Sequence, residues 1–182
     1  MRNFRKLLII IGLLAVAGWG LNQLLRVFQI GVSQPAIDWR APSEDQAYPD
    51  LTRYPHAWLD VNTRRQRVYV RNGRRTLYTM YCSTGTGANA TPTGTFYIQA
   101  ERGKFFYNPT SGEGARYWVS WKDHGVYLFH SVPTNKQGDY ITKEAKQLGR
   151  TAASHGCIRL SVADAQWVYR HVPYGMKVVI HA

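Results

Sequence analysis

The sequence predicts a mainly β domain with one short helix, preceded by an apolar N-terminal segment. Short segments alternate apolar and polar residues between turn-forming residues, and one stretch near the C-terminus has the spacing and cap of a helix. A further observation is an uninterrupted apolar run at the N-terminus. The 182 residues, 45% of them hydrophobic, suffice for one packed domain and its attachments. We expect a β-sandwich or a partly closed sheet without internal repeats.

The apolar run is predicted to be a transmembrane helix. Three basic residues precede it, and it covers residues 7–21 and continues to Leu25. About 17 to 25 apolar residues can span a bilayer, and a cationic flank stays cytoplasmic. We therefore assign residues 1–30 to a cytoplasmic flank and a single-pass anchor in the cell membrane. The alternative is a signal peptide cleaved at the small residues 15–17. Both interpretations place the domain outside the cytoplasm, on the cell-wall side.

Residues 31–55 differ in composition from both neighbouring segments. They contain half of the chain's 8 prolines, mixed with Ser, Asp and Glu. Such a mixture is typical of an extended tether. We expect an extracytoplasmic linker here, and we assign the folded domain to residues 56–182.

Alternating segments predict the strands of the domain. Asn72-Gly73 is a strong signal for a tight hairpin turn between two of them. Residues 83–94 are rich in Gly and Thr and predict a loop. The helix is expected to begin after Ser161, which can cap it, and to end near His171. The expected strands cover residues 57–62, 67–71, 76–82, 95–100, 117–121, 126–130 and 177–181.

The formal net charge of +12 favours association with polyanions such as nucleic acid, anionic lipid or acidic wall polymers. The expected export and the absence of a recognition motif oppose nucleic-acid binding. The two cysteines, Cys82 and Cys157, are too few for a disulfide scaffold, although they could bridge one another. Cys82 lies in an apolar segment, so we expect it in the core.

The segment Ser-His-Gly-Cys-Ile-Arg-Leu at residues 154–160 carries the chemistry. A free thiol has a pKa of about 8.5, so a cysteine nucleophile needs a nearby base or positive charge. His155 and Arg159 lie close to Cys157 in sequence, and the fold could bring His130 near it.

Gly156 leaves room for a substrate carbonyl to approach the neighbouring backbone amides, which could form an oxyanion hole. A zinc site built from His130, His155 and Cys157 lacks paired ligand motifs. We therefore expect neither a metal nor a cofactor.

These residues resemble the L,D-transpeptidase catalytic domain, also called the YkuD family. The resemblance runs from about residue 57 to the end of the chain and includes several landmarks in order. They are Leu59-Asp60-Val61, Val68-Tyr69-Val70, Ser83-Thr84-Gly85, Thr91-Pro92-Thr93-Gly94, His130 and Ser154-His155-Gly156-Cys157. Short fragments could match by chance, but the ordered set is specific. The resemblance implies peptidoglycan stem peptides as partners.

The resemblance also implies a cysteine acyltransferase. Cys157 would attack the L,D peptide bond after the diamino-acid third residue of a stem tetrapeptide, expel the terminal D-alanine and hold the remainder as a thioester. An amine of a neighbouring stem would resolve the thioester and form a 3-3 cross-link. His130 would take the thiol proton, and the carbonyl of Ser131 would fix the imidazole tautomer.

The other motif residues receive supporting roles from the resemblance. His155 would shape the site, and the amides of Gly156 and Cys157 would stabilise the oxyanion. Ser131 and Ser154 are expected to contact the substrate. Arg159 would hold the loop or meet a substrate carboxylate.

Tyr117 and Trp121 could line the stem-peptide groove, although alternating aromatics of a strand are more often core. Residues 131–153, between the expected base and the cysteine motif, form a longer segment than is common in the family, which leaves the shape of the acceptor groove open.

Three alternatives share these features. Water in place of the amine acceptor would give an L,D-carboxypeptidase with the same catalytic residues. A sortase-like transpeptidase also combines an anchor with Cys, His and Arg, but its Thr-Leu-x-Thr pattern is absent. A non-enzymatic wall-binding module would use the positive charge alone.

Overall fold

The computed structural model describes residues 36–182, and the expected membrane anchor at residues 1–30 lies outside them. Among the residues described, no helix is both long and apolar enough to cross a bilayer. Residues 37–182 form one compact unit.

Nine strands form one mixed sheet in the order β4-β9-β1-β2-β3-β8-β7-β6-β5. The pairs β1–β9 and β7–β8 are parallel, and the other neighbours are antiparallel. Every predicted strand has a counterpart, although the one expected at residues 95–100 ends at Tyr97, and two further strands, β5 and β8, were not predicted. The strands are β1 Ala57–Asn62, β2 Arg67–Asn72, β3 Arg75–Ser83, β4 Gly94–Tyr97, β5 Arg102–Asn108, β6 Glu113–Lys122, β7 Tyr127–Ser131, β8 Ile158–Leu160 and β9 Lys177–His181.

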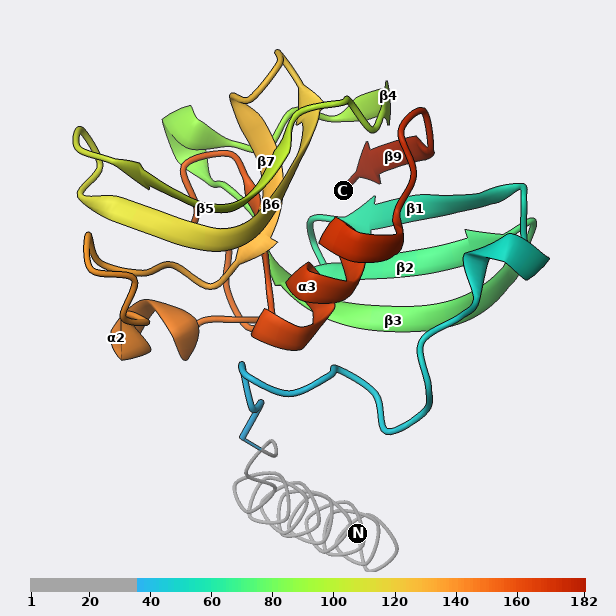
Figure 1. Cartoon of the computed structure of the whole chain (residues 1–182), viewed down its shortest axis with the longest axis horizontal. Coiled ribbons are helices and arrows are strands. Elements are labelled where there is room, and N and C mark those ends of the chain that lie inside the picture. The colour runs from blue at the N-terminus through green and yellow to red at the C-terminus, as the bar shows by residue number, and fades with distance from the viewer. Residues whose placement is uncertain (1–35) are drawn as a thin grey trace, which may run out of the picture. The chain divides into compact units, whose positions relative to one another are not determined.

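Of the two architectures expected, a β-sandwich or a partly closed sheet, the structure has the second, because the sheet is continuous through β3 and β8. Figure 1 shows β1, β2 and β3 on one side of the domain and β5, β6 and β7 on the other, with α3 (Val162–His171) lying between them. Apolar side chains of both halves and of α3 form one buried core, including Leu59, Val70, Phe129 and Val168. The sheet therefore curls around a single core.

The cap predicted for α3 is confirmed. The Ser161 side chain accepts a hydrogen bond from the backbone N–H of Asp164 at 3.1 Å, and the backbone N–H of Val162 donates to the carbonyl of Trp39 at 2.9 Å. A second short helix, α2 (Thr142–Ala145), was not predicted and lies in the long segment before the cysteine motif. Two short 3-10 helices, η1 (Leu51–Arg53) and η2 (Gly87–Asn89), complete the described elements.

The interpretation of residues 31–55 as a free linker is wrong from Ile37 onward. Trp39 is buried, and the hydroxyls of Ser43 and Tyr48 both donate hydrogen bonds to the carboxylate of Asp164 in α3. Ser43 and Glu44 also accept hydrogen bonds from the backbone of β3, which has no strand partner on that side at those positions. The prolines of this segment predicted a tether. Polar side chains between them instead accept hydrogen bonds from backbone N–H groups at the edge of β3.

Candidate active site

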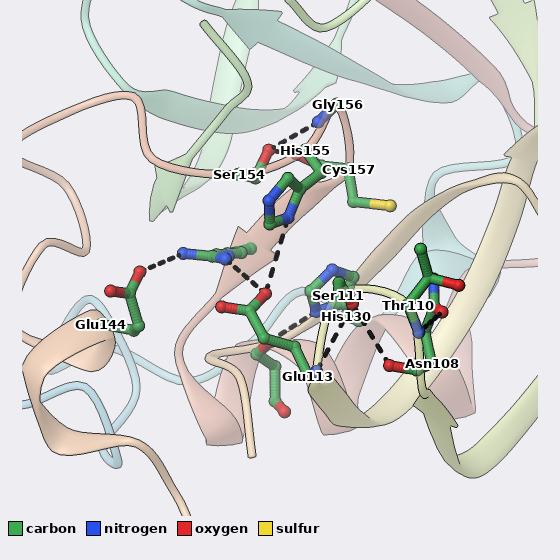
Figure 2. Close-up of polar contacts among 12 residues, drawn as sticks. Asn108, Thr110, Ser111, Glu113, His130, Glu144, Ser154, His155, Gly156 and Cys157 are labelled. Atoms are coloured by element: carbon green, nitrogen blue, oxygen red, sulfur yellow. Dashed lines mark hydrogen bonds and ion pairs between the residues drawn. The ribbon is translucent and has the colours of Figure 1, made fainter. Parts of the chain in front are cut away.

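The cysteine motif lies at the centre of the sheet, because β8 follows it directly and pairs with both β3 and β7. In the parallel register of β7 and β8, His130 is opposite Arg159. Side chains alternate between faces along a strand, so those of the paired residues His130 and Arg159 project from the same face, and Cys157 directly precedes β8. The two expected catalytic side chains, His130 and Cys157, line one cavity of about 230 Å³. Figure 2 shows the polar contacts of this region.

The loop that carries Cys157 is held by two glycine- and threonine-rich segments. The backbone N–H of Ser154 donates to the carbonyl of Thr84 at 3.0 Å, beside a bridge between Ser154 and Gly85. A Cβ at Gly85 would lie 1.9 Å from the carbonyl oxygen of Asn89, so only glycine fits there. The Thr91 hydroxyl accepts from the Gly85 amide at 2.8 Å and donates to the Gly156 carbonyl at 3.0 Å.

The Gly156 amide is not a free oxyanion donor, which corrects the role expected from the sequence. It donates to the hydroxyl of Ser154 at 3.1 Å, and that hydroxyl in turn donates to the carbonyl of Cys157 at 2.5 Å. Ser154 is largely buried, and its hydroxyl stabilises the loop through these two hydrogen bonds, although the residue also lines the cavity of Cys157. Gly156 has a φ of +113, and a Cβ there would lie 2.9 Å from the ring of Tyr127. Glycine is therefore required for the conformation of the loop.

His130 is held as a neutral imidazole with a defined tautomer. Its Nδ1 lies 2.6 Å from the carbonyl oxygen of Ser131, which can only accept, so Nδ1 carries the proton and Nε2 does not. Burial lowers the pKa of His130 to about 4, and the Arg159 guanidinium acts in the same direction. The ring of Phe106 packs edge-on against the imidazole at a centroid distance of 5.7 Å. The contact expected between His130 and Ser131 is confirmed. The substrate contact expected of Ser131 is not, because Ser131 is fully buried and does not line the cavity.

The Cys157 side chain is a neutral thiol in this environment. Burial raises the pKa of Cys157 to about 11, although a backbone hydrogen bond at Leu128 and the Arg159 charge act against the increase. The sulfur lies 3.5 Å from the carbonyl oxygen of Val126. Both cysteines are free, and Cys82 is buried in β3, so the possible bridge between them is not formed. No group of three metal-ligating side chains that could hold an ion occurs in the described part of the chain.

These pKa values predict how the thiol reacts with an alkylating agent. Below a pKa of about 11, the thiolate fraction of Cys157 increases about tenfold with each pH unit. The rate at which iodoacetamide alkylates Cys157 is therefore expected to rise about tenfold per unit between pH 7 and pH 10. Peptide mapping would follow Cys157 separately from Cys82. A rate that is flat across this range would instead indicate a preformed thiolate–imidazolium pair and contradict the neutral state.

Arg159 is buried and joined to two carboxylates. Its guanidinium lies 2.8 Å from Glu113 Oε2 and 2.9 Å from Glu144 Oε2, with 3% of its side chain exposed. His155, which is 60% exposed, approaches the same Glu113 oxygen at 3.7 Å. Arg159 therefore holds β6, β8 and α2 together, which agrees with the expected loop-holding role. Arg159 also lines the cavity of Cys157, with Nη1 donating to Glu144 and Nη2 donating to Glu113.

Two aromatic residues expected in the substrate groove lie elsewhere. Trp121 is 1% exposed and packs in the core against Phe96 and Phe129. Tyr117 packs against Tyr169 of α3. Neither lines the cavity of Cys157, because the curl of the sheet turns their face of β6 toward the core and α3.

The comparison with known families decides the assignment. The sequence model of the L,D-transpeptidase catalytic domain (YkuD) matches residues 56–180. The chain belongs to this family.

A curated YkuD-family relative is closely similar in sequence. The chain is 50% identical over 151 residues to the protein named "Putative L,D-transpeptidase YciB" of Bacillus subtilis (strain 168), and the match covers 81% of this chain and 76% of that protein. The sequence resemblance to the family is thus confirmed.

Solved L,D-transpeptidases share the fold. An L,D-transpeptidase from Mycobacterium smegmatis superposes with a TM-score of 0.57 at 22% identity, covering 70% of this chain and 59% of that chain. L,D-transpeptidase 3 from Mycobacterium tuberculosis, in complex with a faropenem-derived adduct, gives 0.55 at 21%, covering 70% and 60%. This chain therefore spans less than two thirds of either solved protein.

Sequence reasoning missed several residues of this YkuD-family site. Glu113 was not predicted because it lies at a hairpin tip far from the motif in sequence, and Glu144 was not predicted because it lies in an unpredicted helix. The residue that could have indicated these two carboxylates is Arg159, because a buried guanidinium needs carboxylates to pair with. Thr91 and Gly85 appeared as family landmarks, and the structure gives their physical reason, which is support of the cysteine loop.

Proposed function

We propose that this YkuD-family chain is a peptidoglycan L,D-transpeptidase that joins stem peptides through a thioester on Cys157. The observation that carries the proposal is that Cys157 and an imidazole with an unprotonated Nε2 line the same cavity. A neutral imidazole is the form that can remove a proton from a neutral thiol.

In the first half-reaction the sulfur attacks the carbonyl of the third stem residue while His130 Nε2 takes the thiol proton. The imidazolium then donates this proton to the nitrogen of the departing D-alanine as the peptide bond breaks. The Ser131 carbonyl accepts from Nδ1 throughout, in the place of a triad carboxylate. We assign the oxyanion to the backbone N–H of Cys157, because that of Gly156 is engaged by Ser154.

In the second half-reaction an amine of a neighbouring stem attacks the thioester carbonyl. His130 removes the amine proton and returns it to the sulfur, which leaves as a thiol. The product is an amide, the 3-3 cross-link. Water in place of the amine would give a tripeptide, which is the carboxypeptidase reaction.

The test is product analysis with the full-length chain in detergent and a purified disaccharide-tetrapeptide. We expect free D-alanine and a cross-linked dimer, both absent with Cys157→Ala. Tripeptide monomer without dimer would assign the carboxypeptidase activity. If the intact protein releases no D-alanine from the tetrapeptide, the proposed function is contradicted.

We also propose that the reaction takes place on the cell-wall side of the membrane, where stem peptides are found. The proposal is supported by the basic residues before the apolar run at residues 7–21. Protease added to intact spheroplasts should degrade the domain, and a domain protected until lysis would contradict this location.

A further inference from the structure

Glu113 is the first residue of β6 and lies at the tip of the hairpin formed with β5. The tip is fixed by a pair of hydrogen bonds between the backbones of Gly114 and Thr134, at 2.8 and 2.7 Å. This places the Glu113 carboxylate in the wall of the cavity that holds Cys157 and His130.

The charges around Arg159 do not balance. One guanidinium faces two carboxylates, those of Glu113 and Glu144, so these three side chains together carry a surplus negative charge. No other Lys or Arg among the described residues lines the cavity. A negative surplus at this position stands out in a chain with a formal net charge of +12.

One oxygen of Glu113 remains available to a ligand. Its Oε2 contacts Arg159 at 2.8 Å and His155 at 3.7 Å, whereas Oε1 makes no hydrogen bond to the described residues, as Figure 2 shows. The side chain is 22% exposed. Glu144 contacts the same guanidinium at 2.9 Å but does not line the cavity.

We propose that Glu113 binds the ammonium group of the diamino acid at the third position of a stem peptide. This inference rests on the proposed function and deepens it. A side-chain amine is protonated near neutral pH, and a partly buried carboxylate with one free oxygen is its natural partner. The ammonium can belong to the donor stem, where it would fix the scissile bond over Cys157, or to the acceptor stem, where it would lose one proton to solvent and become the attacking amine.

The test compares Glu113→Gln with Glu144→Gln. Each variant removes one carboxylate from Arg159 and retains an amide oxygen that can accept from it, but only the first alters the cavity wall. Loss of the charge partner is expected to weaken an ammonium-dependent step at least about tenfold in Glu113→Gln only. A loss of equal size in Glu144→Gln would show that Glu113 acts through Arg159 and would overturn the proposal.

Two measurements, or arms, of this experiment identify whether the ammonium belongs to the donor stem or to the acceptor stem. Acyl-enzyme formation is timed by intact mass with one tetrapeptide that has a diamino acid at position three and another that has alanine there. A Glu113→Gln defect confined to the diamino donor assigns the donor ammonium. A fall in the ratio of cross-linked to hydrolysed product, with acylation unchanged, assigns the acceptor. Unchanged values in both arms would overturn the proposal.

Faropenem, which carries no ammonium group, supplies the remaining control. Its adduct should form on Glu113→Gln at a rate within about threefold of the unaltered protein, because Cys157 and His130 are retained and the Glu113 charge is the smallest of the influences on the pKa of Cys157. If the unaltered protein forms the faropenem adduct but no acyl-enzyme with any stem peptide, the proposed function itself fails, which is distinct from a failure of Glu113 alone.

Discussion

Replacing His130 by asparagine is expected to lower kcat/KM for D-alanine release by between about 10² and 10⁴-fold, the usual contribution of a positioned general base. The asparagine amide can still donate to the Ser131 carbonyl, as Nδ1 does at 2.6 Å, so the loop geometry is retained. What is lost is Nε2, the atom that takes the thiol proton. The measurement is the steady-state rate of D-alanine release from a stem tetrapeptide.

A pH profile separates this role from a structural one. With a His130 pKa of about 4, the base is neutral above that value, so kcat/KM should fall only as the pH decreases through about 4. His130→Asn should lose this acid limb while retaining a thermal midpoint close to that of the parent. A variant that keeps more than a tenth of the activity would show that another group accepts the thiol proton.

Replacing Arg159 by methionine is expected to reduce the free energy of unfolding by about 3 kcal/mol, because removing one partner of a buried ion pair leaves charges uncompensated. The value lies at the low end of the usual range since Glu113 and Glu144 are 22% and 25% exposed and can partly rehydrate. For a domain of this size the thermal midpoint should fall by roughly 6 to 12 °C. Calorimetry or circular dichroism would measure it.

The matched control removes all three charges. The triple variant Arg159→Met, Glu113→Gln, Glu144→Gln has no uncompensated carboxylate, so it should recover much of the stability lost by Arg159→Met alone. If the single variant loses less than about 1 kcal/mol, the network is not what holds β6, β8 and α2 together.

The catalytic pair could be predicted from sequence because its signals are local and chemical. A cysteine beside glycine and histidine is rarely a simple core residue, and the distant His130 was identified by the ordered landmarks of the family. Strand alternation, the Asn72-Gly73 turn and the cap at Ser161 are equally local, and all three are confirmed.

The remaining features depend on long-range pairing that a single sequence does not encode locally. Whether the face of Trp121 meets the core or the cavity depends on the curl of the sheet. The Gly156 amide donates a hydrogen bond to the Ser154 hydroxyl, and the spacing of residues in the sequence does not predict this bond. Residues 37–55 pack on β3 and α3 although their prolines suggest a tether, because their polar groups meet backbone and side-chain partners far along the chain.

Cys157 and neutral His130 line one cavity, and the central proposal is that Cys157 forms a thioester with a stem peptide there. Its most direct test is the intact mass of the full-length protein mixed with a disaccharide-tetrapeptide and quenched in acid. We predict an added mass equal to the donor less D-alanine, located on Cys157 by peptide mapping and removed by hydroxylamine. An unmodified Cys157 while D-alanine is released, or an adduct on another residue, would contradict the account.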